Sequence, residues 1–274
     1  MSVSRKSGFP LDYVGVSKVD LGIGGKLALI TGAGRGLGQS IAQTLAREGA
    51  TIVAVSRTKK SLDRLLLELP KGNHRSLSLD LERSDAATDV FKFMSQERLH
   101  PDIIVNNVGG NLGVTDPLCS ASEWRKVFHL NLEVAVEINR HFIPKMRANA
   151  WGRICHISSV AASENQGPPT YCAAKAALNA YVRSVGRYVS PDNVVLTSVM
   201  PGAVLTEGGY WDVASRERES HVKSYLESRM AIRRFGRPEE VSELVAFMCS
   251  QHASFCVGTN VLVDGGQGRS FYKG

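Results

Sequence analysis

A tyrosine and a lysine in the segment YCAAK could work together as an acid–base pair. Tyr171 and Lys175 are four residues apart in an Ala-rich stretch, so on a helix both side chains point the same way. A free phenol has a pKa of about 10 and exchanges protons poorly at neutral pH. A neighbouring ammonium stabilises the phenolate and lowers that pKa. The phenol could then donate a proton to a carbonyl oxygen, or accept one in the reverse direction. The same spacing also occurs on ordinary helix surfaces, so the rest of the chain must decide.

A glycine-rich segment, TGAGRGLG, precedes this pair in the chain and could hold a phosphate. Gly32, Gly36 and Gly38 lack side chains, so the backbone can turn tightly and its N–H groups can approach an anion. An apolar run ends at Gly32 and a helical pattern follows, which places the positive end of a helix dipole at the same point. The segment does not end in Gly-Lys-Ser or Gly-Lys-Thr, which excludes a P-loop. The pattern therefore predicts a dinucleotide site.

The end of the second expected strand, VAVSRT, indicates which dinucleotide binds. A site for NAD carries an acidic residue here to bind the ribose hydroxyls. This chain has Ser56 followed by Arg57, and Arg35 lies in the glycine loop. Two guanidinium groups near the ribose favour a 2′-phosphate by charge and by bidentate geometry. NADP(H) is therefore favoured over NAD(H), although both arginines could simply be solvated.

Short apolar runs and helical patterns alternate along the whole chain and must position these residues. Each run is apolar throughout, which is typical of parallel strands covered on both faces. The expected strands are 26–31, 51–56, 76–81, 102–107, 152–159, 194–199 and 260–266, and the expected helices are 37–48, 61–69, 85–96, 122–148, 171–189 and 239–250. No linker interrupts them, so we expect an α/β fold: one doubly wound Rossmann domain over residues 25–274, with a parallel sheet of about seven strands and helices on both faces. Residues 1–24 form an N-terminal extension, and the charged, aromatic insert 204–232 is predicted to be a substrate lid.

The composition is that of an ordinary globular protein: 274 residues, 43% hydrophobic and 22% charged. The first residues lack the apolar core of a secretory signal, so we expect a cytoplasmic protein without a membrane anchor. A net charge of +7 permits an anionic partner, but the basic residues are scattered and no nucleic-acid motif occurs. The five cysteines form no CxxC pair, which argues against a disulfide framework. The histidines lack metal-ligand spacing, so no metal is expected.

Several motifs in order identify a family resemblance. These are TGAGRGLG, Asp80 after the third strand, NNVG at 106–109, Asn131, ISS at 157–159, YCAAK and PGAVLT at 201–206. Over residues 24–268 this combination resembles the short-chain dehydrogenase/reductase family. The segment FGRPEEV…NVLVDGG at 235–266 is similar to the 3-oxoacyl-(acyl carrier protein) reductase branch, and AVSRT is similar to NADPH-dependent carbonyl and xylulose reductases. NNVG departs from the family's usual NNAG, so Val108 adds bulk beside the cofactor cleft.

The resemblance implies a catalytic tetrad. Tyr171 is the acid or base, and Lys175 lowers its pKa and holds the nicotinamide ribose. Asn131 interrupts its helix and holds a water that links Lys175 to solvent. Ser159 orients the substrate carbonyl, although the family spacing of thirteen residues before the tyrosine fits Ser158, so either serine could fill this role.

The resemblance also implies the cofactor contacts. Asp80 and Leu81 flank the adenine, Asn106 and Gly109 lie near the ribose, and the nicotinamide is lined by residues of PGAVLT. The expected cofactor-binding residues are Gly32, Arg35, Gly36, Leu37, Gly38, Ser56, Arg57, Asp80, Leu81, Asn106, Gly109, Tyr171, Lys175, Pro201, Gly202 and Thr206.

These motifs imply a reductase that converts a ketone to a secondary alcohol with NADPH. The substrate could be a 3-oxoacyl thioester, a sugar ketone or another small carbonyl compound. It could be linked to a carrier protein or to a phosphate group. Two alternatives stay open: an alcohol or sugar dehydrogenase that works in the oxidative direction, and a regulatory protein that binds NADP(H) without turnover. Family members commonly form tetramers through their two long helices and last strand, so a homotetramer is expected, with a dimer as the alternative.

Overall fold

A seven-stranded parallel sheet forms the centre of the molecule. The computed structural model describes residues 19–270, and its strand order is β3-β2-β1-β4-β5-β6-β7. The strands are β1 (Leu27–Thr31), β2 (Thr51–Ser56), β3 (Arg75–Ser78), β4 (Ile103–Asn106), β5 (Gly152–Ile157), β6 (Val194–Pro201) and β7 (Asn260–Val263). The order reverses between β1 and β4, and in open α/β sheets such a switch point forms a crevice at the carboxyl ends of the strands. The predicted fold class is therefore confirmed.

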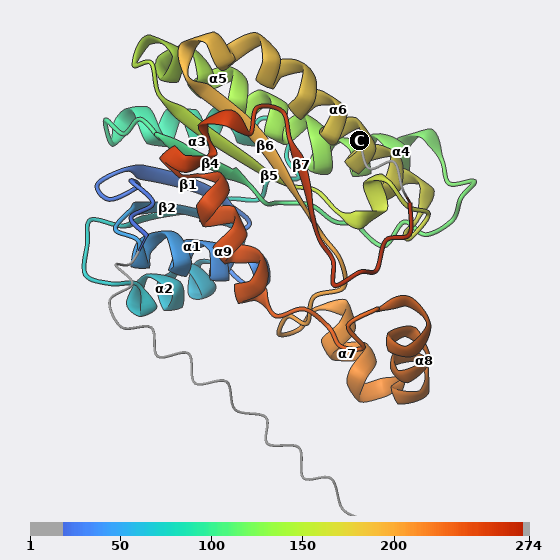
Figure 1. Cartoon of the computed structure of the whole chain (residues 1–274). Helices are drawn as coiled ribbons and strands as arrows, with labels where there is room; N and C mark the ends of the chain where they lie inside the picture. The colour runs from blue at the N-terminus through green and yellow to red at the C-terminus, as the bar shows by residue number, and fades with distance from the viewer. Residues whose placement is uncertain (1–18, 271–274) are drawn as a thin grey trace, which may run out of the picture.

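Helices cover both faces of this sheet (Figure 1). On one side lie α1 (Gly36–Arg47), α2 (Lys59–Glu68) and α9 (Pro238–Met248), and on the other α3 (Ala86–Gln96), α5 (Val134–Ala148) and α6 (Pro169–Val189). Two apolar clusters match the two layers: Ile41 and Val245 belong to one, and Val90 and Ile138 to the other.

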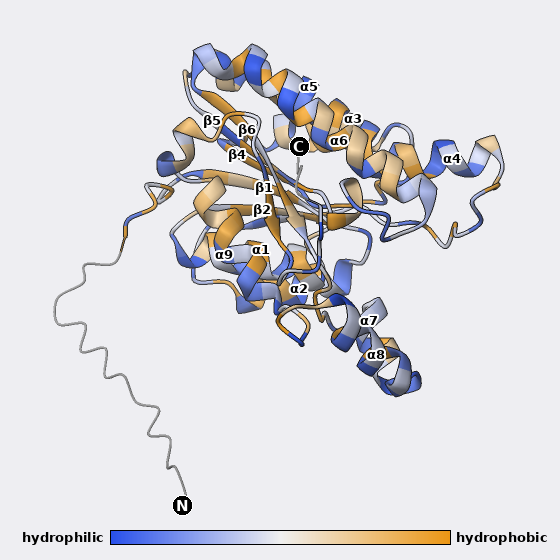
Figure 2. Cartoon of the chain, turned by 45° about the vertical axis from the view of Figure 1, so that its right-hand side comes forward, coloured by the Kyte–Doolittle hydropathy of each residue, from blue (hydrophilic) through white to orange (hydrophobic). Residues whose placement is uncertain are grey.

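The central strands are buried on both faces, because helices pack against each of them. All four residues of β4 and all six of β5 are buried, Arg153 and His156 included, so their apolar residues do not alternate with exposed polar ones. Figure 2 shows the sheet between helices along which hydrophobic and hydrophilic residues alternate. The sheet therefore gives a rigid frame from whose edge the loops project.

One expected helix is interrupted. The segment predicted as one helix over 122–148 consists of α4 (Ala121–Phe128), a π-helical turn at His129–Glu133 and α5. The wider turn contains Asn131, in agreement with the interruption that the family resemblance implies. π-Turns inside α-helices are frequent at functional sites.

The third strand is shorter than expected. It ends at Ser78 rather than at residue 81, so Asp80 and Leu81 lie in the turn that follows, and Asp80 Oδ1 accepts the Glu82 N–H at 3.0 Å. This turn leads away from the sheet edge beside the loop after β2.

The insert 204–232 contains two short helices, α7 (Tyr210–Glu217) and α8 (Glu219–Arg229). They project from the carboxyl edge of the sheet as a small unit (Figure 1). Most of the predicted N-terminal extension lies outside the described residues, although Ile23 is buried in the first apolar cluster. Within residues 19–270, no helix has the length and apolar character that a membrane span requires.

Candidate active site

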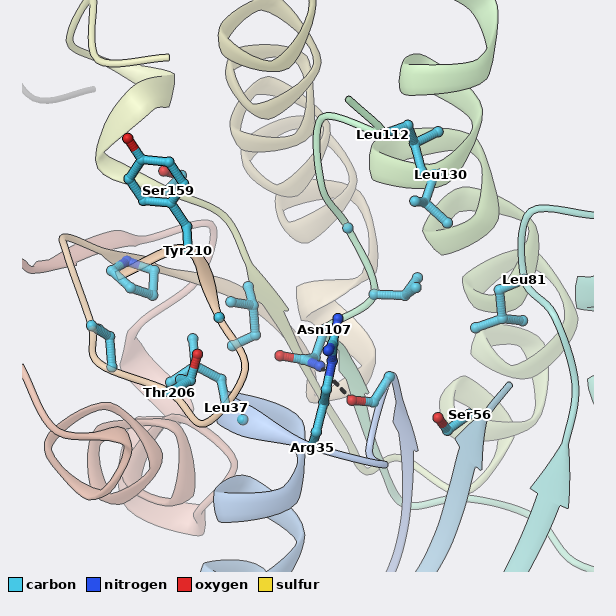
Figure 3. A pocket seen from close by; sticks show the side chains of 18 of the residues that line it. Arg35, Leu37, Ser56, Leu81, Asn107, Leu112, Leu130, Ser159, Thr206 and Tyr210 are labelled. Atoms are coloured by element: carbon cyan, nitrogen blue, oxygen red, sulfur yellow. Dashed lines mark hydrogen bonds between the residues drawn. The ribbon is translucent and has the colours of Figure 1, made fainter. Parts of the chain in front are cut away.

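A cavity of about 500 Å³ opens at the carboxyl ends of the strands and joins the glycine loop to the YCAAK helix (Figure 3). Most of the predicted site residues line it. From the predicted set these are Gly32, Arg35, Gly36, Leu37, Ser56, Arg57, Asp80, Leu81, Gly109, Ser159, Tyr171, Lys175, Pro201, Gly202 and Thr206. Gly38, Asn106 and Asn131 lie behind its walls. One continuous cavity therefore connects the two motifs, which are about 140 residues apart in the sequence.

The glycine loop needs its glycines for two different reasons. Gly32 and Gly36 have φ angles of 66° and 57°, which L side chains rarely adopt. At Gly38 the reason is space, because a Cβ there would lie 2.2 Å from the Gly32 carbonyl oxygen. Gly38 thus lets the first turn of α1 pack directly against the loop, and the amino end of α1 faces the cavity.

The far end of the cavity, beside Ser56, carries two arginines in different states. Arg57 Nη1 pairs with Glu82 Oε1 at 2.8 Å, and both side chains are largely exposed. Arg35 is exposed and points into the cavity (Figure 3), and its guanidinium has no hydrogen bond or ion pair within residues 19–270. One guanidinium is therefore free to meet an anion, while the other must first leave a carboxylate.

Asn107, not Asn106, lies at the cavity. Asn106 is the last residue of β4, and its buried side chain donates to Asn139 Oδ1 at 3.0 Å on the α5 side. Asn107 Nδ2 donates instead to the carbonyl oxygens of Thr31 and Gly32, at 3.0 and 3.2 Å, and so ties β4 to the glycine loop. Successive side chains of a strand point to opposite faces, so the structure places Asn107, rather than the predicted Asn106, at the cavity. The strand alternation was the signal that could have found Asn107.

Tyr171 and Lys175 lie in the first turns of α6 on one side of the helix. Lys175 Nζ stands 5.7 Å from the centre of the Tyr171 ring and donates to the Ile157 carbonyl oxygen at 2.8 Å. The lysine is only 2% exposed, so its stem is fixed between β5 and α6. The helix begins at Pro169. Proline fits there because the N–H groups of the first turn have no partner within the helix, so the N–H that proline lacks is not missed.

Burial controls the protonation of both groups. It lowers the pKa of Lys175 from 10.5 to about 8, because a buried ammonium has lost its hydration. Burial also raises the pKa of Tyr171, and a hydrogen bond with the Ser159 side chain opposes this rise without overcoming it. The sequence-based expectation of a lowered phenol pKa is therefore not met in the chain itself. The physical reason is that loss of water around the phenolate outweighs the stabilising contacts.

Ser159 rather than Ser158 is the partner of the phenol. The Ser159 side chain bonds Tyr171, and its Oγ accepts the Ala161 N–H at 3.1 Å, which fixes its orientation. Ser158 Oγ points toward α6, where it donates to the Lys175 carbonyl oxygen at 3.5 Å. The geometry thus favours the serine that the strand end fixes over the one that the family spacing favours.

Asn131 lies behind Lys175 and holds the loop after β4. Its Oδ1 accepts the Gly110 N–H at 3.0 Å, and its Nδ2 donates to the Gly110 and Val127 carbonyl oxygens at 2.7 and 2.8 Å. Gly109 separates the two side chains, because a Cβ there would lie 2.7 Å from Asn131 Oδ1 and 2.9 Å from Lys175 Nζ. Only glycine keeps this corner of the cavity open.

Aromatic side chains of the insert complete the wall opposite the sheet. Tyr210 and Trp211 line the cavity, and the Trp211 ring packs against Tyr225 and Phe235 with centroids 4.2 and 4.8 Å apart. Glu207 adds a carboxylate at the rim. No group of three or more histidine, cysteine, aspartate or glutamate side chains that could hold a metal ion occurs within the described residues.

Known proteins resemble the chain over nearly its whole length. A family model described as "Enoyl-(Acyl carrier protein) reductase" matches residues 32–267. The uncharacterized oxidoreductase YvrD of Bacillus subtilis is 33% identical over 270 residues, which cover 92% of this chain and 100% of that protein. The 3-oxoacyl-[acyl-carrier-protein] reductase FabG of Pseudomonas aeruginosa is 30% identical over 246 residues, which cover 88% of this chain and 97% of that protein.

The fold is also similar to that of an enzyme of known structure. The crystal structure of L-sorbose reductase from Gluconobacter frateurii, complexed with NADPH and L-sorbose, aligns with a TM-score of 0.83 at 29% identity. The alignment covers 92% of this chain and 100% of that one. The matched family region, residues 32–267, includes the glycine loop, α6 and the cavity between them.

Proposed function

The chain belongs to the short-chain dehydrogenase/reductase family, and we propose that it is an NADPH-dependent reductase of a ketone. Members of this family are oxidoreductases that act on CH–OH and C=O groups. The observation that carries the proposal is that one continuous cavity is lined by the glycine loop together with Tyr171, Lys175 and Ser159. A binding module for dinucleotides would need the loop alone. A site that also presents a phenol beside a buried lysine is suited to proton transfer.

The residues of the cavity fit a dinucleotide. Gly32 and Gly36 leave the backbone open where a phosphate would be held, and α1 directs its amino end to the same place. Leu81 and Asp80 would flank the adenine, and Pro201, Gly202 and Thr206 would line the nicotinamide. A bound reduced nicotinamide would supply the hydride for the carbonyl carbon.

The chain's own residues would manage the proton. Tyr171 donates its hydroxyl proton to the carbonyl oxygen, and the Ser159 hydroxyl donates a hydrogen bond to the same oxygen and so orients it. Lys175 holds the ribose and stabilises the phenolate that remains after the transfer. Asn131 fixes the loop beside Lys175, and we keep the prediction that a water at this point returns the proton from solvent.

The preference for NADP(H) rests on Arg35 and Arg57. Neither Ser56 nor the residue after it offers the carboxylate of an NAD site. Arg35 is free to bind a 2′-phosphate, and the similar L-sorbose reductase structure contains NADPH. Replacing Arg57 by Asp should raise the KM for NADPH and lower that for NADH. An unchanged KM for NADPH would contradict the assignment.

The substrate class follows from the relatives and from the insert. The FabG relative is named for a 3-oxoacyl carrier substrate and the solved neighbour for L-sorbose, so a 3-oxoacyl thioester or a sugar ketone would suit the cavity. We propose that the insert 204–232 is the substrate lid, because Tyr210 and Trp211 line the cavity next to the acid–base pair. The same residues could also serve alcohol oxidation. The pH dependence of the reduction and oxidation rates distinguishes the two directions.

Assembly and location remain predictions from the sequence. We propose a homotetramer in the cytoplasm, built through the outer faces of α4, α5 and α6 and through β7. Light scattering at micromolar concentration that gave the mass of one chain would contradict this assembly.

The direct test compares the Tyr171→Phe variant with the wild type on a panel of ketones. The loss of NADPH absorbance measures turnover. Turnover should fall at least about a thousandfold, because the proton donor is lost, while NADPH binding by fluorescence titration stays close to that of the wild type. Full turnover in the variant would refute the proposed mechanism. Cofactor binding by the wild type without turnover of any ketone would favour the regulatory protein instead.

A further inference from the structure

The segment that follows β7 holds the insert against the rest of the molecule. We call residues 264–270 the C-terminal clasp. The Asp264 carboxylate accepts the N–H groups of Gly266 and Gly268 at 3.0 and 2.8 Å, which builds a tight turn. At the start of this turn the Gly265 carbonyl oxygen accepts the Ile232 N–H at 3.2 Å, at the end of the insert. Near the end of the clasp, Arg269 donates to the Ser228 carbonyl oxygen at 2.6 Å.

The clasp also holds the loop between β5 and α6, which leads to Tyr171. Glu164 lies in this loop, and its Oε1 accepts the N–H groups of Arg269 and Ser270 at 2.8 and 2.7 Å. One carboxylate oxygen thus fixes the end of the clasp on the catalytic side of the cavity.

A single buried amide lies at the centre of this arrangement. Gln267 is 3% exposed, and its Oε1 accepts the Ala203 N–H at 2.7 Å where β6 enters the insert. Its Nε2 donates to the Tyr225 hydroxyl of α8 at 2.8 Å and to Gln166 Oε1 in the β5–α6 loop. All the hydrogen-bonding atoms of the side chain are used, and each bond reaches a different segment. The partners are 42 to 101 residues away in the sequence.

Both ends of this network touch the site. Tyr225 packs on Trp211, whose ring lines the cavity. Gln166 precedes Gly167, where an added Cβ would lie 3.4 Å from Tyr171 Cδ1. The amide therefore connects the aromatic wall of the insert with the loop that carries the phenol.

We propose that Gln267 is a positioning residue, which sets the distance between the insert and the β5–α6 loop and thereby the affinity for the carbonyl substrate. A buried polar group that bridges three segments resists their separation, because parting them would leave its partners without hydrogen bonds in a dry environment. The clasp then holds the insert in the arrangement that encloses the substrate. The part of the test that uses turnover rests on the proposed ketone reduction, whereas the part that uses hydrogen exchange does not.

The test compares Gln267→Met and Tyr225→Phe with the wild type. Methionine has nearly the shape of glutamine but cannot make these bonds, and phenylalanine keeps the ring that packs on Trp211 while it loses the hydroxyl. Amide hydrogen exchange over 210–229 should become about tenfold faster in Gln267→Met and about threefold faster in Tyr225→Phe. The KM for the ketone should rise by similar factors, with kcat and the NADPH Kd within about twofold of the wild type. The matched control is Gln43→Met, which removes an amide whose side-chain hydrogen bond within residues 19–270 goes to Glu68, and it should leave both quantities unchanged.

A residue with a purely structural role would lower the yield and Tm without changing KM, and that result would overturn the proposal. Exchange over 210–229 within twofold of the wild type in both variants would overturn it as well. If Gln267→Met did not fold, Tyr225→Phe would decide, since it removes one hydroxyl only. If the wild type reduced no ketone, the proposed function would fail, and the exchange rates alone would still decide the role of Gln267.

Discussion

Replacing Lys175 by Met should abolish ketone reduction and at the same time make the folded protein more stable at neutral pH. The lysine is 2% exposed, and burial lowers its pKa from 10.5 to about 8. At pH 7 the folded chain therefore carries a buried ammonium. The lowered pKa means that this charge reduces the free energy of unfolding by about 3 kcal/mol. Methionine removes this penalty but leaves the Ile157 carbonyl oxygen without its donor, which costs about 1 kcal/mol. The variant should thus gain about 2 kcal/mol in its free energy of unfolding.

The pH dependence of this gain has a definite sign. Between pH 8 and 10.5 the unfolded chain binds more protons at this lysine than the folded chain does, so the wild type becomes more stable as pH rises. By pH 9.5 the penalty falls to about 1.4 kcal/mol, and the advantage of the variant should shrink to nearly zero. Urea unfolding at equal protomer concentration, at pH 7 and pH 9.5, measures both differences.

The control is Lys60→Met, because Lys60 is exposed and its replacement should change stability by less than about 0.5 kcal/mol at either pH. Equal stability differences between Lys175→Met and the wild type at the two pH values would refute the reasoning, because burial would then not oppose the charge. Ketone turnover that survived in the variant would separately refute the role of the lysine in the site.

Three further outcomes follow from the geometry. Gly109→Ala places a Cβ 2.9 Å from Lys175 Nζ, so kcat/KM should fall at least about tenfold, whereas Gly24→Ala, whose Cβ would meet nothing closer than 4.0 Å, should not change it. Glu82→Gln releases Arg57 from an exposed ion pair, so the Kd of NADPH measured by titration should fall about two- to fivefold while that of NADH stays constant. Since burial raises the pKa of the Tyr171 phenol, the reduction rate should stay constant from neutral pH into the weakly alkaline range, whereas the oxidation rate should rise with pH across the same range; rate profiles with the same shape in both directions would contradict this.

The sequence predicted the parts of the site that depend on local spacing. The strands alternate with helices at regular intervals, and Tyr171 and Lys175 share one side of α6 because four residues make about one helical turn. The glycine loop was equally readable, since its glycines stand between a strand and a helix. The structure departs from the prediction where one residue changes the direction of a side chain, as for Asn106 and Asn107 at the end of β4.

Other features depend on contacts that spacing cannot reveal. Arg57 meets Glu82 25 residues further along the chain, because the loops after β2 and β3 lie side by side. The clasp around Gln267 depends on the paths of the insert and of the chain after β7, and neither path has a periodic pattern. Burial was hidden in the same way: the sequence showed the ammonium near the phenol but not that the Lys175 side chain is 2% exposed.

Burial affects the protonation state of the Tyr171 phenol. A phenol whose pKa is raised by burial carries its proton at neutral pH, so Tyr171 is in its acid form in the chain without a cofactor. A carbonyl oxygen that receives a hydride needs such an acid at once, whereas an alcohol that is to be oxidised needs a phenolate, which burial disfavours. The Ser159 hydrogen bond opposes the rise, and the lowered pKa of Lys175 leaves less positive charge beside the ring near pH 8 and above. Burial therefore adds to the ordinary preference of a phenol for its protonated form, which is the form that the proposed ketone reduction requires.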